Sequence, residues 1–214
     1  MIRWLLGAGI ALVLAGCDVP QTGTGGARGP SAPIVQTSDI PQELTPQMAA
    51  RKRLLLQGQG WLNGQHQVKN VDILAAQGAA SLASLFADLD PTRPVLVITE
   101  GLVNYFELEL IESFWTRLAD QLCQFPQATY LTELYPDLRE HPRYRQLRWG
   151  VGLIGRLTRG NYPLHYRNDQ AIVQGFQRCG FSQVEVFDPS RTAQALGLAP
   201  SRNAGLVRVI EARV

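Results

Sequence analysis

The stretch "RPVLVITEGLVNYFELELIESFWTRLA", residues 93–119, decides the fold class. It begins with an almost uninterrupted apolar run, residues 94–99, which is typical of a strand buried on both faces of a sheet. Apolar residues then recur at steps of four, which predicts an amphipathic helix with one face toward the sheet. These residues are Phe106, Leu110, Phe114, Leu118 and Leu122. A strand followed by such a helix is the repeating unit of α/β proteins.

The rest of the chain continues this alternation of strands and helices. Strands are predicted in "PIVQTSDIP", in "HQVKNVDIL" with its end at Asp72, and in "QATYLTELYP". Helices are predicted in "LTPQMAARKRLLLQ", in "GAASLASLFADL", and in "NDQAIVQGFQRCGF" with its end at Gly180. The last two strands, "SQVEVFDPS" and "GLVRVIEARV", predict an antiparallel hairpin. The fold class is therefore α/β, a Rossmann-like sheet that is mostly parallel with a C-terminal antiparallel strand pair.

Composition narrows the possible functions. The 214 residues carry 20 Lys+Arg against 18 Asp+Glu, a net charge of +2, and this balance argues against a nucleic-acid partner. The three cysteines form no CxxC or Cys/His cluster, so no metal site is expected. Cys123 and Cys179 are predicted to be core or near-core thiols, and a disulfide between them stays open.

The first residues resemble a bacterial lipoprotein signal. In residues 1–17, Arg3 precedes the short apolar segment "WLLGAGIALVLAG", and "LAGC" would place a lipid on Cys17. Residues 18–33 are rich in Gly, Pro, Thr and Ser and are predicted to be a linker. Residues 34–214 are predicted to form the α/β domain. Association with a membrane is expected only if Cys17 is lipidated.

Three acidic residues follow successive predicted strands: Asp39, Asp72 and Glu100. In open α/β sheets, ligands bind at the carboxyl ends of the strands. The first carboxylate could accept hydrogen bonds from ribose hydroxyls, the second from an adenine amine, and the third could pair with an ammonium group. Together they would bind an adenosine that bears a cationic amino acid. The alternative is that each acid only caps a turn or a helix.

Three stretches in order resemble the leucine carboxyl methyltransferase-like family of class I O-methyltransferases, which depend on S-adenosyl-L-methionine (AdoMet). Residues 93–119 resemble its apolar strand, which ends in Glu-Gly, an aliphatic pair and then Tyr. "IVQTSDIPQELTPQMAARKRLL" resembles its second strand, Asp-x-Pro turn and helix. "NYPLHYRNDQAIVQGFQRCGFSQVEVFDP" resembles its C-terminal helix, Gly-Phe turn and strand. The resemblance covers roughly residues 34–214.

This resemblance implies AdoMet as cofactor and a role for each matching residue. Asp39 would bind the ribose, Asp72 would lie by the adenine, and Glu100 with Gly101 would hold the methionine end. Tyr105 would border the pocket for a small-molecule or carboxylate methyl acceptor, unless it is an aromatic residue that only packs at the helix start. The sequence does not identify the acceptor. The arginines of residues 135–165 would suit an anionic or carboxylate acceptor, or they belong equally well to a solvated helix.

His165 lies between two tyrosines in the same region, residues 162–166. It is interpreted as a surface or satisfied histidine in preference to a catalytic base.

The N-terminal part departs from the family pattern. The segment "IALVLAG" could stand for the first strand, but it lacks the expected acidic residue, and "PQTGTGGARGPS" is a poor helix former. Two explanations stay open. Either a lipoprotein signal is joined to the later part of a methyltransferase, giving a non-catalytic, lipid-anchored envelope protein, or the start or reading frame is misplaced and the enzyme is cytoplasmic. The second is favoured, because all three strand-end acids are present.

Overall fold

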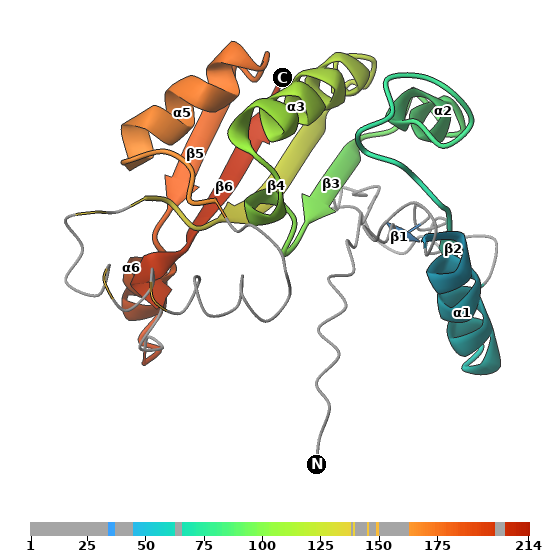
Figure 1. Ribbon diagram of the computed structural model, residues 1–214, viewed down its shortest axis with the longest axis horizontal. Coiled ribbons are helices and arrows are strands. Elements are labelled where there is room, and N and C mark those ends of the chain that lie inside the picture. Colours follow the sequence, from blue (N-terminus) through green and yellow to red (C-terminus); the bar gives the residue numbers. More distant parts are fainter. Residues whose placement is uncertain are drawn as a thin grey trace, which may run out of the picture. The chain divides into compact units, whose positions relative to one another are not determined.

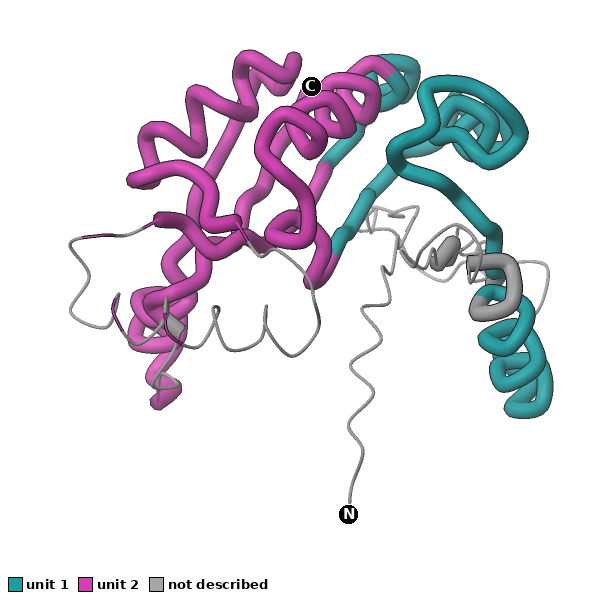
Figure 2. Tube along the Cα trace, viewed as in Figure 1, with its two compact units in different colours: residues 1–99, 121–129 teal, residues 100–120, 130–214 magenta. Residues whose placement is uncertain are grey.

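The computed structural model describes residues 34–36, 45–62, 66–137, 139, 145, 149, 163–199 and 204–214. The chain divides into two compact units, shown in different colours in Figure 2. Unit 1 comprises residues 1–99 and 121–129, and unit 2 comprises residues 100–120 and 130–214. The predicted signal and linker, residues 1–17 and 18–33, lie outside the described residues.

Unit 1 contains a small parallel strand pair, β1 (Ile34–Gln36) with β2 (His66–Val68). Helix α1 (Thr45–Gly58) follows β1, close to the predicted helix, and the Arg53 Nε donates to the Val68 carbonyl at 2.9 Å. Helix α2 (Leu82–Ala87) is shorter than predicted, because the side chain of Ser81 accepts from the Ser84 N–H and caps its start.

Strand β3 (Val95–Thr99) follows the predicted apolar run closely. Three of its five residues are buried, in alternation. After α3 the chain returns to lie beside the start of β3, where the Val95 N–H donates to the Gln127 carbonyl at 2.9 Å. An edge-to-face contact between Phe86 and Phe125, with centroids 5.9 Å apart, adds apolar packing in unit 1.

The main sheet has four strands in the order β3-β4-β6-β5 (Figure 1). Strand β4 (Ala128–Leu134) has its first two residues in unit 1 and the others in unit 2. Strands β5 (Gln183–Phe187) and β6 (Arg208–Arg213) are antiparallel, as predicted.

They do not form a simple hairpin, because helix α6 (Pro189–Ala195) and the short 3-10 helix η2 (Ala204–Leu206) connect them. Strand β6 lies between β4 and β5, and β5 is the edge strand. The burial patterns of the two strands agree with this strand order. Strand β6 has alternate residues buried, whereas β5 has none that is fully buried.

Helices α3 (Leu108–Leu122) and α5 (Asp169–Arg178) enclose the aromatic core of unit 2. Trp115 of α3 packs on Phe176 of α5 with centroids 4.2 Å apart, and its indole N–H donates to the Tyr130 hydroxyl on β4 at 3.2 Å. Phe181 contacts both Tyr130 and Phe176. Each such side chain contributes about 2–3 kcal/mol on burial, so this cluster holds the two helices to the sheet.

The apolar face of α3 agrees with the predicted steps of four only in part: Phe114, Leu118 and Leu122 are fully buried as predicted, but the earlier steps are not kept. Leu110 is 48% exposed, whereas Ile111 and Trp115 are fully buried. The reason is geometric: four residues turn an α-helix by about 400°, so a strict step of four drifts around the helix by roughly 40° each time. Alternating steps of three and four keep one face toward the core, which is the observed pattern.

The ends of α5 agree with the sequence. The side chain of Asn168 accepts from the Ala171 N–H at 2.8 Å and caps the start, and Gly180 follows the helix with φ +103°. Of the two free thiols described, Cys179 is buried as predicted, but Cys123 is exposed, because it follows the last turn of α3. None of the described helices has the length and hydropathy needed to cross a lipid bilayer.

Candidate functional site

The loop of residues 100–107 joins β3 to α3 and is called the strand-end loop below. It begins with Glu100, which is exposed, and Gly101, whose φ of +62° lies in the region that favours glycine. The Gly101 N–H donates to the Glu133 Oε1 on β4 at 3.1 Å. No described heavy atom lies within 4 Å of the place that a Cβ of Gly101 would occupy. The start of the loop is therefore held in a tight turn, and no described atom beyond the chain neighbours of Gly101 crowds it.

The other end of the loop is held by Asn104. This residue belongs to a short 3-10 helix, η1 (Val103–Tyr105). Its Nδ2 donates to the Tyr135 carbonyl at 3.0 Å and to the Pro163 carbonyl at 2.7 Å. Its Oδ1 accepts from the Tyr135 N–H at 2.8 Å. One side chain thus connects the loop to the end of β4 and to the segment that precedes α5.

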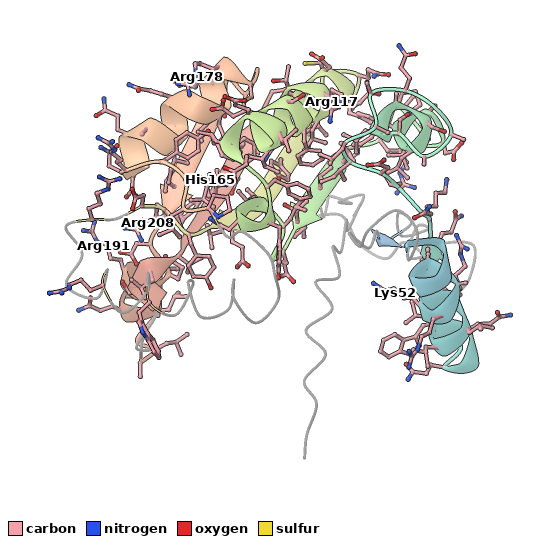
Figure 3. All side chains as sticks on the ribbon, viewed as in Figure 1. Lys52, Arg117, His165, Arg178, Arg191 and Arg208 are labelled. Carbon is pink, nitrogen blue, oxygen red and sulfur yellow. The ribbon has the colours of Figure 1, made fainter. Side chains whose placement is uncertain are left out.

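His165 connects the same segments from inside unit 2 (Figure 3). It is 3% exposed, and its Nε2 lies 3.3 Å from the Val103 carbonyl. Burial lowers the pKa of His165, although hydrogen bonds to the Val103 and Phe106 backbone and the charges of Glu107 and Glu112 act in the opposite direction. The histidine is therefore a neutral, satisfied core residue, the reading preferred from the sequence.

Two tyrosines are partly exposed where the loop meets the end of β4. Tyr105 and Tyr135 are each 40% exposed. Burial, and then the negative charge of Glu133, raise the pKa of Tyr135. The Tyr135 phenol therefore stays protonated at neutral pH. The loop and the end of β4 together carry the carboxylates of Glu100 and Glu133 and the rings of Tyr105 and Tyr135.

A second polar group lies between α3 and α5. The Glu112 Oε1 accepts from the Tyr166 hydroxyl at 2.8 Å and from the Arg178 Nη2 at 3.0 Å. Tyr166 has a φ of +55°, and its ring stacks on Trp115 with centroids 6.5 Å apart. Burial and the hydrogen bond to Glu112 raise the pKa of Tyr166. This group fastens the two helices together.

The predicted adenine residue, Asp72, belongs to unit 1. The predicted strand that ends at Asp72 is too long, because β2 ends at Val68. Asp72 instead starts a turn: its Oδ1 accepts from the Leu74 N–H at 2.9 Å, and its own N–H donates to the Ala80 carbonyl at 2.8 Å. The turn-capping alternative therefore describes the contacts of Asp72.

The predicted ribose residue, Asp39, and the predicted lipidation site, Cys17, both lie outside the described residues. Most of the predicted acceptor-side region, 135–165, does as well.

Of the predicted site residues, the structure brings three together in one loop: Glu100, Gly101 and Tyr105. Sequence reasoning missed Glu133 and Asn104, which hold this loop at its two ends. Glu133 carried a signal, since it is an acidic residue at the end of a predicted strand. Asn104 carried none, because its contacts are with residues 31 and 59 positions away.

The groups at the strand-end loop suit a cationic ligand such as AdoMet, whose sulfonium and ammonium groups are positively charged. Carboxylates pair with an ammonium group, and aromatic faces attract cations. Among the described residues, none beyond the chain neighbours of Gly101 would obstruct a ligand that approaches its backbone. In the described part of the chain, no group of three or more His, Cys, Asp or Glu side chains is placed to hold a metal ion.

Several solved structures resemble this chain. A "putative methyltransferase" from Thermobifida fusca YX matches with a TM-score of 0.54 and 15% identity, over 85% of this chain and 63% of that protein. The chain has the fold of the Thermobifida protein. The α/β class, with a sheet of parallel and antiparallel strands, is therefore confirmed.

Two further structures match at lower scores. PigF, solved with SAH, matches with a TM-score of 0.49 and 13% identity, over 86% of this chain and 43% of PigF. A possible exported protein from Bordetella parapertussis matches with a TM-score of 0.48 and 17% identity, over 84% of this chain and 52% of that protein. The chain thus spans less than two thirds of the length of each of these proteins. No protein-family model matches the sequence, and no curated protein matches it either.

Proposed function

We propose that the chain is an AdoMet-dependent O-methyltransferase of the carboxyl methyltransferase-like group, acting in the cytoplasm on a small-molecule or carboxylate acceptor. The observation that carries the proposal is the strand-end loop. Glu100 and Gly101 begin this loop in a tight turn that Glu133 holds; the partly exposed Tyr105 lies later in the loop, and Asn104 ties the loop to the partly exposed Tyr135 at the end of β4. The likeness in fold to the "putative methyltransferase" from Thermobifida fusca YX supports the same conclusion.

Each residue of the loop has a proposed task. When bound, AdoMet would supply a methyl group on a sulfonium cation. Glu100 would bind the ammonium of its methionine end, and the Gly101 backbone would approach the same end closely. The second carboxylate, Glu133, would add negative charge that favours a cation. Asp39 and Asp72 would bind the ribose and the adenine, and Tyr105 would border the acceptor.

Among the described residues, neither His165 nor Tyr135 suits the role of a base, and this favours a carboxylate as the acceptor. A hydroxyl acceptor must lose a proton during transfer, whereas a carboxylate has already lost it at neutral pH. His165 is 3% exposed and its Nε2 faces the Val103 carbonyl, so it is not placed to take that proton. The raised pKa of Tyr135 makes its phenolate a rare base. Transfer to a carboxylate needs positioning and no base.

The proposal is tested by titrating the purified chain with S-adenosylhomocysteine (AdoHcy) in a calorimeter. Glu100→Gln keeps the shape of the side chain and removes its charge, so the Kd is expected to rise about tenfold. Glu109→Gln is the matched control, because Glu109 is an exposed acidic residue in the first turn of α3. This control is expected to keep the Kd within about twofold of wild type.

Equal Kd values for the two variants would remove Glu100 from the site. If the wild-type chain binds neither AdoHcy nor AdoMet at millimolar concentration, the proposed function is wrong for this chain.

A further inference from the structure

We propose that Asn104 is a positioning residue, which holds the strand-end loop, and with it Tyr105 and Tyr135, in the arrangement that binds the cofactor. The inference rests on the proposed function and deepens it. Asn104 itself has no proposed contact with a ligand. It would act through the two tyrosines and through the backbone of the strand-end loop.

The hydrogen bonds of Asn104 use its amide almost completely. An asparagine side chain offers two N–H donors and one carbonyl oxygen. Both reported donations, to Tyr135 and Pro163, are 3.0 Å or shorter, and the oxygen accepts the Tyr135 N–H at 2.8 Å. The two-way bonding with Tyr135 repeats the pattern of a β-ladder one residue beyond the end of β4. The side chain therefore extends the order of the sheet into the loop.

This arrangement fixes the two exposed aromatic rings at their backbones. Tyr105 is the next residue after Asn104. The side chain of Asn104 bonds both the N–H and the carbonyl of Tyr135. Pro163 belongs to the segment that runs on to His165, which pairs in parallel with Pro136. Asn104 is thus the point at which the loop, the end of β4 and the segment before α5 meet.

Losing the side chain of Asn104 would remove the bonds that tie the loop to the Tyr135 and Pro163 backbones, although the Gly101 N–H would still donate to Glu133 and His165 would still contact the Val103 carbonyl. A ligand would then have to order the other end of the loop on binding. Ordering of this kind reduces affinity, whereas a loop that is already fixed does not need it. Asn104→Ala is therefore expected to raise the Kd for AdoHcy about tenfold.

The experiment combines fluorine NMR with AdoHcy titration. The chain contains six tyrosines, and 3-fluorotyrosine labelling gives each a resonance that a Tyr→Phe variant assigns. In Asn104→Ala, the resonances of Tyr105 and Tyr135 are expected to shift or broaden together. Tyr130 is fully buried, so an unchanged Tyr130 resonance shows that the fold is kept.

Two further variants separate positioning from general stability. Asn168→Ala is the matched control: this asparagine also bonds a backbone N–H, but it caps α5. It is expected to lower thermal stability without moving the Tyr105 and Tyr135 resonances or the AdoHcy Kd. Asn104→Asp keeps the acceptor for the Tyr135 N–H but loses both donations. Its second carboxylate oxygen would face the Tyr135 and Pro163 carbonyl oxygens and repel them, so this variant is expected to change both measurements at least as much as Asn104→Ala.

Unmoved Tyr105 and Tyr135 resonances in Asn104→Ala would overturn the inference. Moved resonances with an unchanged Kd would overturn it as well, because Asn104 would then matter only to structure. Failure of the proposed function looks different: the wild-type chain would bind no AdoHcy. In that case the fluorine spectra would still decide whether Asn104 holds the two tyrosines.

Discussion

Replacing Gly175 by alanine is expected to destabilise unit 2, although alanine is normally the better helix former. A Cβ at position 175 would lie 2.2 Å from the Tyr166 hydroxyl oxygen and 2.5 Å from the ring carbon that bears it. Real contacts of this kind are not that short, so the Tyr166 ring must move. That movement breaks its hydrogen bond to the Glu112 carboxylate and disturbs its stacking on Trp115.

The size of the effect follows from three contributions. Exchanging glycine for alanine inside a helix gains about 1 kcal/mol. Overpacking costs about 1–3 kcal/mol, and a lost hydrogen bond to a charged group costs about 1.5–3 kcal/mol. The expected net change for Gly175→Ala is therefore a loss of about 3 kcal/mol in the free energy of unfolding.

Urea denaturation followed by tryptophan fluorescence measures this change, since Trp115 is fully buried. Gly58→Ala in α1 is the matched control: no described heavy atom lies within 4 Å of its added Cβ, so it is expected to be neutral or slightly stabilising. In a Tyr166→Ala background, the obstacle is gone and Gly175→Ala should no longer destabilise. A Gly175→Ala variant as stable as wild type, or equally destabilised in both backgrounds, would refute the reasoning.

Three further outcomes are expected. Asp72→Ala should weaken AdoHcy binding about tenfold by calorimetry if Asp72 lies by the adenine, and a Kd within about twofold of wild type would contradict that role. Burial holds the pKa of His165 below its usual 6.5, so the unfolded chain binds the proton more readily and the free energy of unfolding should fall as the pH drops below 6.5. His165→Gln should reduce this dependence of stability on pH between pH 7 and 5. An unchanged dependence would exclude His165 as its source. If the lipoprotein reading holds, cells fed labelled palmitate should label the wild-type chain and not Cys17→Ser, whereas no label in either would count against export.

The sequence predicted the long periodic elements of the fold well. Strand β3 and helices α3 and α5 have strong apolar periodicity, and α5 has clear signals at both ends, Asn168 and Gly180. The prediction was poorer where a side chain forms a local hydrogen bond with the backbone that favours a turn over a strand. The run "HQVKNVDIL" looks like one strand, but Asp72 bonds the backbone two residues on and makes a turn.

Strand order was the main feature that the pattern could not supply. Periodicity predicts that "GLVRVIEARV" is a strand, but it does not say that this strand lies between β4 and β5. The same limit applied to the site. Glu100, Gly101 and Tyr105 are neighbours in the sequence, so a local motif found them, whereas Glu133 reaches Gly101 only through the fold, 32 residues away. Contacts of that kind depend on which strands are adjacent.

The interior place of β6 has a consequence for how the protein is made. Synthesis delivers residues from the N-terminus at roughly 5–20 per second, and segments begin to fold as they emerge. Strands β4 and β5 are both synthesised before β6. They do not pair with each other, because β6 lies between them in the sheet. Until residues 208–213 arrive, β4 and β5 each present an unpaired edge, and such edges attract other chains. Nascent chains arrested before residue 208 should therefore aggregate or recruit chaperones more than complete chains do. Addition of β6 is the step that joins β4 and β5 into one sheet.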